Sequence, residues 1–365
     1  MHQSSEPPEP AEIGPALIAW HAQRGRHDLP WQHDRTPYRV WISEIMLQQT
    51  QVSTVIPYFK RFMQRFPDVM ALADAPIDEV LHLWTGLGYY ARARNLHSAA
   101  KRIREEFNGQ FPTEFAAVTS LPGIGRSTAG AILSLSLDER HAILDGNVKR
   151  VVARVFGVEG SPAERRVEQA LWQWAEACTP LQGSAVYTQA IMDLGATVCT
   201  RSRPACDVCP LATGCIARQS GRQDELPTPK ARKPRVLRRS DQIWMLIAQN
   251  SEGAVFLERR PERGIWGGLW CPPEFKTESA CLAYAQQHFR LKRDQAFEPL
   301  KSVKHVFTHF DLEIFPLRMQ GCELTAVMES PLSLWYNPRH LEGVARVGLP
   351  APVKELLDRL TAGYV

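Results

Sequence analysis

Four cysteines close together in the sequence are the clearest chemical feature of this chain. They follow a segment with helical periodicity at 189–198, in the spacing C-x6-C-x2-C-x5-C: Cys199, Cys206, Cys209 and Cys215. Four thiolates this close can enclose one soft metal centre, which means zinc or an iron–sulfur cluster. The unequal gaps differ from the paired C-x2-C knuckles of zinc ribbons. The spacing therefore favours an iron–sulfur cluster over zinc, and over two disulfides.

A glutamate in an apolar segment is a candidate acid. Glu44 lies in the segment 40–47, where helical spacing puts it on one face with Val40 and Leu47. Burial raises the pKa of a carboxyl group, which is what a general acid near neutral pH needs. The alternatives for Glu44 are an ion pair with Arg39 and a position that faces solvent.

A second carboxylate, Asp145, lies in the sequence Leu-Asp-Gly-Asn-Val at 144–148. It comes just before a predicted helix at 147–156, so helix capping alone would explain it. A carboxylate at a helix start is also held rigid and ionised, so the capping and catalytic interpretations are compatible.

A glycine-containing turn connects two predicted helices at 114–119 and 127–137. Its sequence is Leu-Pro-Gly-Ile-Gly, with Gly123 and Gly125 free to form a tight turn. Free backbone N–H groups at the start of the second helix can hold an anion. The turn is therefore typical of the hairpin of a helix-hairpin-helix element, which grips a DNA phosphate, although any helix–turn–helix corner can require glycine.

The composition is that of an ordinary two-domain protein. The chain has 365 residues, 44% of them hydrophobic, and a net charge of only +4, so large cores can form and no global field indicates nucleic acid. No secretory leader and no membrane-spanning run are apparent, and we expect a cytoplasmic bacterial protein. The remaining cysteines are expected to fill apolar cores in a reducing compartment: Cys178, Cys271, Cys281 and Cys322.

The chain divides near residue 220. We expect a disordered tail at 1–12, a helical domain at 13–218 that includes the cysteine loop 199–215, and a linker at 219–239. The linker is basic and could touch phosphates, although a solvated tether is the simpler interpretation. The last domain, 240–365, is predicted to be α+β. Its expected elements are strands at 242–248, 254–257 and 305–315 and a helix at 279–289.

These motifs together resemble the adenine DNA glycosylases of the MutY family, in the helix-hairpin-helix glycosylase superfamily. The matching blocks are Trp-Ile-Ser-Glu-Ile-Met-Leu-Gln-Gln-Thr-Gln-Val at 41–52, Gly-Leu-Gly-Tyr-Tyr-Ala-Arg-Ala-Arg-Asn-Leu at 86–96, the hairpin, Leu-Asp-Gly-Asn-Val and the cysteine loop. The resemblance covers about 20–217 without a break. It implies a mostly α glycosylase domain, followed by an α+β Nudix-like domain that carries Trp-Gly-Gly-Leu-Trp at 266–270.

The resemblance implies excision of adenine opposite 8-oxoguanine or guanine from duplex DNA, by a monomer with one [4Fe-4S] cluster and no catalytic divalent metal. The target base must leave the stack, the departing adenine must be protonated, and the positive charge that develops on the sugar must be balanced. Glu44 matches the family's general acid. Asp145 matches the carboxylate that stabilises the cation, and Asn147 matches a supporting residue.

Position 127 distinguishes subclasses of the superfamily. Bifunctional relatives carry there a lysine that attacks the sugar, whereas this chain has Ser127, which cannot form a Schiff base. Many family members have tyrosine at this place, so the part that the serine hydroxyl plays is open. Lys149 could trap an abasic aldehyde in a side reaction, but a phosphate contact is the preferred interpretation.

Other positions match DNA-handling residues of the family. Leu47, Gln48, Gln49 and Tyr89 would contact or enter the stack near 8-oxoguanine, while ordinary packing is the alternative for each. Trp31 and Gln189 match the adenine pocket, and Arg201 and Arg203 would be presented to phosphates by the cluster.

The C-terminal domain is expected to read DNA and not to hydrolyse pyrophosphates. Between Gly267 and Phe289 the only acidic residues are Glu274 and Glu278, too few for the glutamate-rich box that holds divalent cations. Its segment Phe307-Thr308-His309 matches a Phe-Ser-His element that senses 8-oxoguanine. Thr308 keeps the hydroxyl but adds a methyl group, and a plain β-hairpin is the alternative.

Two other functions are compatible with parts of the pattern. A bifunctional endonuclease III-like glycosylase/lyase is disfavoured by Ser127 and by the added C-terminal domain. A non-catalytic iron–sulfur protein that binds DNA is disfavoured by the presence of both Glu44 and Asp145.

Overall fold

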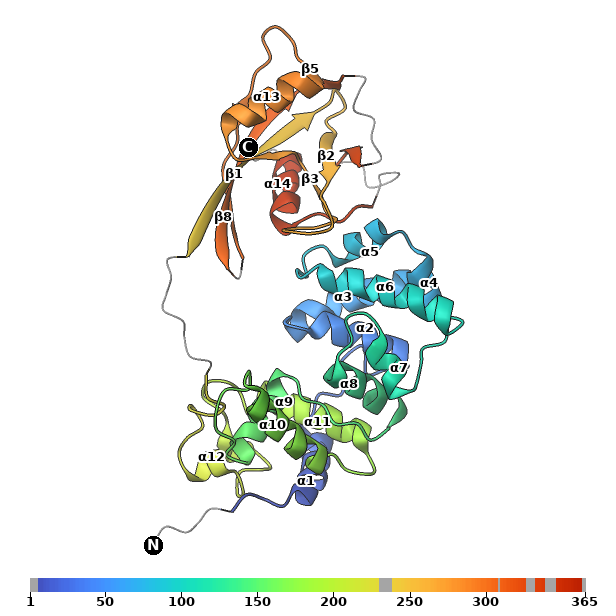
Figure 1. Cartoon of the computed structure of the whole chain (residues 1–365), viewed down its shortest axis with the longest axis vertical. Coiled ribbons are helices and arrows are strands. Elements are labelled where there is room, and N and C mark those ends of the chain that lie inside the picture. The colour runs from blue at the N-terminus through green and yellow to red at the C-terminus, as the bar shows by residue number, and fades with distance from the viewer. Residues whose placement is uncertain (1–5, 230–237, 308, 326–331, 339–345, 363–365) are drawn as a thin grey trace. The chain divides into compact units, whose positions relative to one another are not determined.

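The computed structural model describes residues 6–229, 238–307, 309–325, 332–338 and 346–362 (Figure 1). They form two compact units. The helical unit comprises the described residues within 1–74 and 95–233, and the mixed unit comprises 75–94 together with the described residues from 234 onward. The segment 75–94 thus groups with the C-terminal domain, although the predicted boundaries placed it in the glycosylase domain.

Short helices joined by turns and loops make up the helical unit. They are α1 (Pro10–Arg24), α2 (Pro37–Leu47), α3 (Val52–Arg65), α4 (Val69–Asp74), α6 (Ala91–Glu106), α7 (Phe115–Ser120), α8 (Arg126–Leu137), α9 (Gly146–Val155), α10 (Arg165–Cys178), α11 (Ser184–Thr197) and α12 (Ile216–Gln219), with one 3₁₀ turn, η1 (Cys206–Val208). The helices predicted at 127–137 and 147–156 are confirmed within one residue at each end, whereas the helix predicted at 189–198 is only the last part of α11, which begins at Ser184. The helix α1 begins at Pro10, inside the predicted tail, and residues 1–5 of that tail lie outside the described residues.

Local sequence explains where the helices that carry the candidate site begin. The Thr36 side chain caps α2 by accepting a hydrogen bond from the Arg39 N–H, and Pro37 suits the first helical position because it has no N–H to satisfy. The helix α8 follows Gly125 and ends at Leu137, and its C-terminal cap Asp138 has a left-handed backbone with φ 56°. The helix α2 packs against α8, while α11 packs against α1, α8 and α9.

The mixed unit is built on a twisted sheet. Its strands are β1 (Arg239–Gln249), β2 (Val255–Arg259), β3 (Trp270–Cys271), β4 (Glu274–Phe275), β6 (Glu298–Pro299), β7 (Val303–Val306), β8 (Phe310–Gln320) and β10 (Ser333–Tyr336), and β5 (Phe289–Arg290) pairs separately with β9 (Glu323–Leu324). The strands β1 and β8 pair in parallel over their full length, from Arg239 opposite Phe310 to Gln249 opposite Gln320. The helices of this unit are α5 (Ile77–Trp84), α13 (Glu278–His288) and α14 (Ala351–Ala362).

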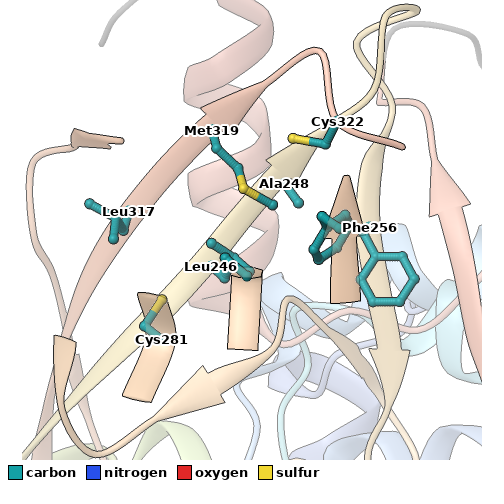
Figure 2. Close-up of a cluster of buried hydrophobic side chains, with 9 residues drawn as sticks. Leu246, Ala248, Phe256, Cys281, Leu317, Met319 and Cys322 are labelled. Carbon is teal, nitrogen blue, oxygen red and sulfur yellow. The ribbon is translucent and has the colours of Figure 1, made fainter. Parts of the chain in front are cut away.

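The core of this unit follows from the alternation of side chains along strands. Every second residue of β1 and β8 points to the same face, so Leu246 and Ala248 meet Leu317 and Met319 in one buried cluster (Figure 2). Phe256, Phe289, Ala285 and two cysteines, Cys281 and Cys322, complete it. The free thiols of Cys178 and Cys271 are buried as well, so the prediction that these four cysteines fill apolar cores is confirmed.

Two sequence predictions differ from the structure. The segment 305–315 was predicted as one strand, but it belongs to two, β7 and β8, which pair antiparallel. Residues 307–309, of which 308 lies outside the described residues, make the turn of the chain between them. The alternation of apolar residues continues across that turn, so periodicity alone could not locate it. Part of the predicted linker is also packed: the Leu226 carbonyl accepts a hydrogen bond from Arg154 Nε at 2.9 Å, and the Thr228 hydroxyl accepts one from the Gly160 N–H at 3.2 Å. Most of the basic run, 230–237, lies outside the described residues.

In the part of the chain that the structure describes, no helix is both long and apolar enough to span a bilayer.

Candidate active site

The hairpin between α7 and α8 exposes the start of α8. Gly123 has φ 79° and lies so close to α6 that a Cβ atom there would be 2.9 Å from Asn95 Cβ, so only glycine fits. Gly125 has no heavy atom within 4 Å of its Cβ position. As the N-terminal cap of α8 it leaves backbone N–H groups free of helical partners, which suits an anion such as a phosphate.

The segment that leads into Asp145 is held against α8 by two contacts. At Gly130 a side chain would collide with the backbone, because a Cβ atom would lie 2.6 Å from the Ala142 carbonyl oxygen. The Ser127 hydroxyl accepts a hydrogen bond from the Leu144 N–H at 2.9 Å. Leu144 directly precedes Asp145, the predicted catalytic carboxylate. The Ser127 hydroxyl therefore helps to fix the backbone that leads into Asp145.

Asp145 caps α9, as predicted. Its Oδ1 accepts a hydrogen bond from the Val148 N–H at 2.7 Å. Burial raises the pKa of Asp145, and the backbone N–H bonds from Val148 and Asn147 and the positive charges of Arg150 and Lys149 oppose that rise. The carboxylate is thus rigid, with several groups that favour its ionised form.

Glu44 lies on α2 with its side chain partly accessible to solvent. Burial among neighbouring protein atoms and, to a smaller extent, the negative charge of Asp145 together raise the pKa of Glu44 to about 8. The alternative partner Arg39 is engaged elsewhere: its Nη2 donates to the Pro30 carbonyl at 3.2 Å, and its guanidinium lies 5.5 Å from the Phe59 ring centroid.

The two carboxyl groups are therefore unequal partners. Glu44 keeps its proton at neutral pH, whereas Asp145, bonded to backbone N–H groups, gives up its proton more readily. An acid whose pKa is raised by a neighbouring carboxylate can donate a proton while that carboxylate stabilises positive charge. The structure thus brings together two residues that are 101 positions apart by their residue numbers.

Asn147 is fixed between α9, α11 and the cysteine loop. Its Oδ1 accepts a hydrogen bond from Arg150 Nη2 at 2.8 Å, and Arg150 Nε donates to the Cys199 carbonyl at 2.7 Å. Gly195 of α11 packs directly on it, because a Cβ atom at Gly195 would be 2.6 Å from Asn147 Cβ. Its side-chain oxygen is thus engaged within the protein.

Gln189 belongs to a buried polar cluster that the sequence analysis missed. Its Nε2 donates to Asp193 Oδ1 at 2.9 Å, and Asp193 also binds the backbone N–H of Arg26 at 2.8 Å and its Nε at 2.9 Å. Although burial opposes the shift, the pKa of Asp193 is lowered, first by the side chain of His21 and then by the two Arg26 hydrogen bonds and the guanidinium charge. With its amide nitrogen directed at Asp193, Gln189 keeps its carbonyl oxygen available as an acceptor. The spacing 189–193 on a predicted helix, i and i+4, could have indicated the pair.

The other predicted contact residues have mixed surroundings. Trp31 is buried and packs edge-on against Phe59 with 5.5 Å between ring centroids. Leu47 and Gln48 are half-buried at the end of α2, and Gln49 is exposed with a left-handed backbone, φ 57°.

Lys149, which was predicted to contact a phosphate, has a carboxylate partner within the protein. Its Nζ forms an ion pair with Glu168 Oε1 at 2.6 Å. The amine can reach a phosphate only by leaving that partner, and the ion pair also lowers its availability as a nucleophile.

The four cysteines of the loop line one cavity. Its walls include apolar side chains of α9 and α11 and the aliphatic part of Arg154. The buried Arg154 donates through Nη1 to Cys199 Sγ at 3.4 Å and to the Thr200 carbonyl at 2.7 Å. Burial raises the pKa of the Cys209 thiol to about 11, so a bound cation would be needed to hold this sulfur as a thiolate at neutral pH.

Four sulfurs around one cavity fit the donor set of an iron–sulfur cluster. The fit is one of donor types and not of positions, because among the described residues no three or more His, Cys, Asp or Glu side chains, these cysteines included, are arranged as a group that could hold a metal ion. Arg201 and Arg203 are exposed on the same loop, and the Arg201 carbonyl accepts a hydrogen bond from Arg154 Nη2 at 3.0 Å.

The predicted 8-oxoguanine element lies in the turn between β7 and β8 of the mixed unit. Phe307 stacks on Phe310 with ring centroids 4.5 Å apart and contacts Trp266, and His309 is exposed. Thr308 lies outside the described residues. Arg238, which immediately precedes β1, donates to the Phe307 carbonyl and forms an ion pair with Asp311 at 2.7 Å, so it grips both sides of the turn.

Comparison with known proteins agrees with this geometry. Residues 42–177 match the HhH-GPD superfamily base excision DNA repair protein family, and residues 243–359 match the NUDIX domain family. The adenine DNA glycosylase of Buchnera aphidicola subsp. Schizaphis graminum is 40% identical over 343 residues, which cover 94% of this chain and 96% of that protein. The human adenine DNA glycosylase is 34% identical over 366 residues, covering 84% of this chain and 67% of the relative.

Among solved structures, a thermostable thymine-DNA glycosylase is similar to 58% of this chain and 97% of its own, with a TM-score of 0.53 and 26% sequence identity. The high coverage of the curated relatives, together with both domain matches, shows that this enzyme belongs to the adenine DNA glycosylase family.

Proposed function

We propose that this enzyme excises adenine paired with 8-oxoguanine or guanine in duplex DNA, acts as a monomer and leaves an abasic site without cutting the strand. The observation that carries the proposal is the pair of unequal carboxyl groups. Glu44 holds a proton at neutral pH, and the rigid Asp145 at the start of α9 lies close enough to raise the pKa of Glu44.

The two groups supply the two requirements of N-glycosidic hydrolysis. Glu44 gives its proton to a ring nitrogen of adenine, and the electrons of the bond between C1′ and the base pass to the departing ring. Asp145 balances the positive charge that develops on the sugar. Water then adds to C1′, where it leaves a hydroxyl group, and the one proton that it releases passes to the Glu44 carboxylate, which restores the starting state.

The absence of strand cleavage is proposed from the chemistry at position 127. A lysine there would attack C1′, whereas the Ser127 oxygen accepts a hydrogen bond from the Leu144 N–H. The amine of Lys149, whose charge acts on Asp145, is paired with Glu168. These contacts favour hydrolysis by water over a covalent amine intermediate.

DNA binding is proposed to use four separate parts of the chain. The hairpin Gly123–Gly125 would bind a phosphate, and Trp31 and Gln189 would hold the flipped adenine. The exposed residues Gln49 and Tyr89 would fill the stack at the mispair. The turn at 307–309, braced by Arg238, would contact 8-oxoguanine.

We also propose that Cys199, Cys206, Cys209 and Cys215 hold one [4Fe-4S] cluster with a structural role. When bound, the cluster would supply the cationic centre that keeps the four sulfurs ionised. The loop that it fixes carries Arg201 and Arg203 on its surface, where phosphates can reach them.

The test uses duplexes that carry adenine opposite 8-oxoguanine or guanine, beside duplexes with cytosine or thymine in place of the adenine. Strand breaks are scored with and without alkali. We expect breaks only at adenine and only after alkali. Breaks without alkali would favour the glycosylase/lyase alternative and direct attention to Lys149, and tight binding without any product would favour a non-catalytic DNA-binding protein.

A further inference from the structure

Tyr89 is an exposed aromatic residue on a loop with an unusual backbone. Its side chain is 52% exposed, and its φ is 48°. Two glycines of the same loop also have left-handed backbones, Gly86 with φ 102° and Gly88 with φ 69°. For a tyrosine, unlike a glycine, this backbone conformation is strained. It persists only where surrounding contacts impose it, and strained residues of this kind cluster at functional sites. That Tyr89 enters the DNA stack is part of the proposed function, on which this inference rests.

The loop is braced internally on both sides of Tyr89. Trp84 Nε1 donates to the Gly88 carbonyl at 3.2 Å, and Arg92 Nη2 donates to the Leu87 carbonyl at 3.2 Å. The Arg92 guanidinium also lies 5.5 Å from the Trp84 ring centroid and 5.6 Å from that of Tyr89. Tyr89 is thus fixed relative to the end of α5.

The C-terminal domain holds this loop through backbone groups of 347–349. The Tyr90 hydroxyl donates to the Leu349 carbonyl at 2.9 Å, and the Leu349 N–H donates to the Thr85 hydroxyl at 3.3 Å. Leu349 therefore forms hydrogen bonds with residues on both sides of Tyr89 in the sequence, Thr85 before it and Tyr90 after it. Arg94 adds a third attachment, because its Nη1 donates to the Gly267 carbonyl at 2.7 Å.

The helix before the loop is packed into the same domain. Trp270 Nε1 donates to Asp78 Oδ1 at 3.0 Å. Leu81 is fully buried, and a Cβ atom at Gly348 would lie only 2.5 Å from Leu81 Cβ, so the backbone at 348 lies directly on α5. These contacts explain why 75–94 belongs to the mixed unit.

We propose that Leu349, through its hydrogen bonds to Thr85 and Tyr90, is a positioning residue for Tyr89 on DNA. The C-terminal domain, which carries residues 307–309, would then have a second function. It would hold the side chain of Tyr89 in position to enter the DNA stack. A side chain held in its bound position loses less conformational entropy on binding. The C-terminal domain should therefore assist excision of adenine opposite plain guanine, where no 8-oxoguanine is present.

The test is a double-mutant cycle on a duplex with an adenine:guanine mispair, using the full chain. Tyr90→Phe removes the bond to Leu349, and it should lower kcat/KM about fivefold, the usual effect of one lost hydrogen bond. In a Tyr89→Ala background the same change should have an effect below about twofold, because the side chain to be positioned is gone. Tyr284→Phe is the matched control, since it removes a hydroxyl bond to Glu258, 2.6 Å long, elsewhere in the same unit.

Equal losses from Tyr90→Phe in both backgrounds, or no loss in either, would overturn the proposal. Amide hydrogen exchange at 86–92 without DNA gives an independent answer: faster exchange in Tyr90→Phe than in Tyr284→Phe supports positioning, and equal exchange refutes it. If the wild-type chain excised no adenine, the proposed function would fail, and the exchange measurement would still decide whether Leu349 holds the loop.

Discussion

Replacing Glu44 by glutamine should abolish excision and at the same time stabilise the fold. Glutamine has nearly the same shape as glutamic acid but no charge. Burial and the charge of Asp145 raise the pKa of Glu44 from 4.5 to about 8. The free energy of unfolding of the wild-type protein is therefore lowered at any pH where Glu44 is ionised in the unfolded chain but protonated in the folded protein.

The magnitude follows from the two pKa values. Below pH 4.5 both states are protonated, and this loss of stability is absent. As the pH rises from 4.5 to 8, only the unfolded state loses its proton, and wild-type stability falls by about 1.4 kcal/mol per pH unit relative to the glutamine variant. The difference should reach about 3 kcal/mol at pH 7 and level off near 5 kcal/mol above pH 8.

Urea unfolding followed by tryptophan fluorescence at pH 4, 5.5, 7 and 8.5 measures this difference. Glu252→Gln, the same substitution at an exposed position in the turn between β1 and β2, is the control. A difference between wild type and Glu44→Gln that did not change with pH, or a glutamine variant less stable than wild type at pH 7, would show that Glu44 is not a buried acid.

Three further outcomes are expected. Excision should slow as the pH rises above 8, because Glu44 then loses the proton that it donates; an unchanged single-turnover rate at pH 9 would contradict this role. Gly195→Ala should lower the free energy of unfolding by about 1–3 kcal/mol and reduce excision, because its Cβ atom would be 2.6 Å from Asn147 Cβ; thermal unfolding and single-turnover kinetics measure both effects. Arg238→Ala should reduce the preference for 8-oxoguanine over guanine without changing the excision rate at saturating enzyme, because it frees the Phe307 turn; the test is the ratio of dissociation constants for the two duplexes.

The parts of the site that could be predicted from sequence depend on short-range rules. The cap at Asp145, the hairpin glycines and the helical setting of Glu44 each follow from residues within a few positions of one another. Helix periodicity and capping are encoded locally, so these predictions agree with the structure.

The parts that could not be predicted depend on residues far apart in the chain. The Arg26–Asp193 hydrogen bonds join positions 167 residues apart, and nothing in either local sequence identifies the partner. The parallel pairing of β1 with β8 and the grouping of 75–94 with the C-terminal domain are long-range in the same way. The pattern around 305–315 failed for a different reason, because alternation does not reveal a turn whose flanking residues keep the same period.

The attachment of 75–94 to the C-terminal domain has a consequence for how the chain folds during synthesis. The Tyr90–Leu349 hydrogen bond joins residues 259 positions apart. At about 5–20 residues per second, the ribosome needs roughly 13–50 s to make the intervening chain. Throughout that interval the apolar face of α5 has emerged without the backbone at 348 that covers Leu81. The nascent protein therefore exposes an apolar surface on α5 that can bind other chains or chaperones. That surface is buried only after residue 348 has been synthesised.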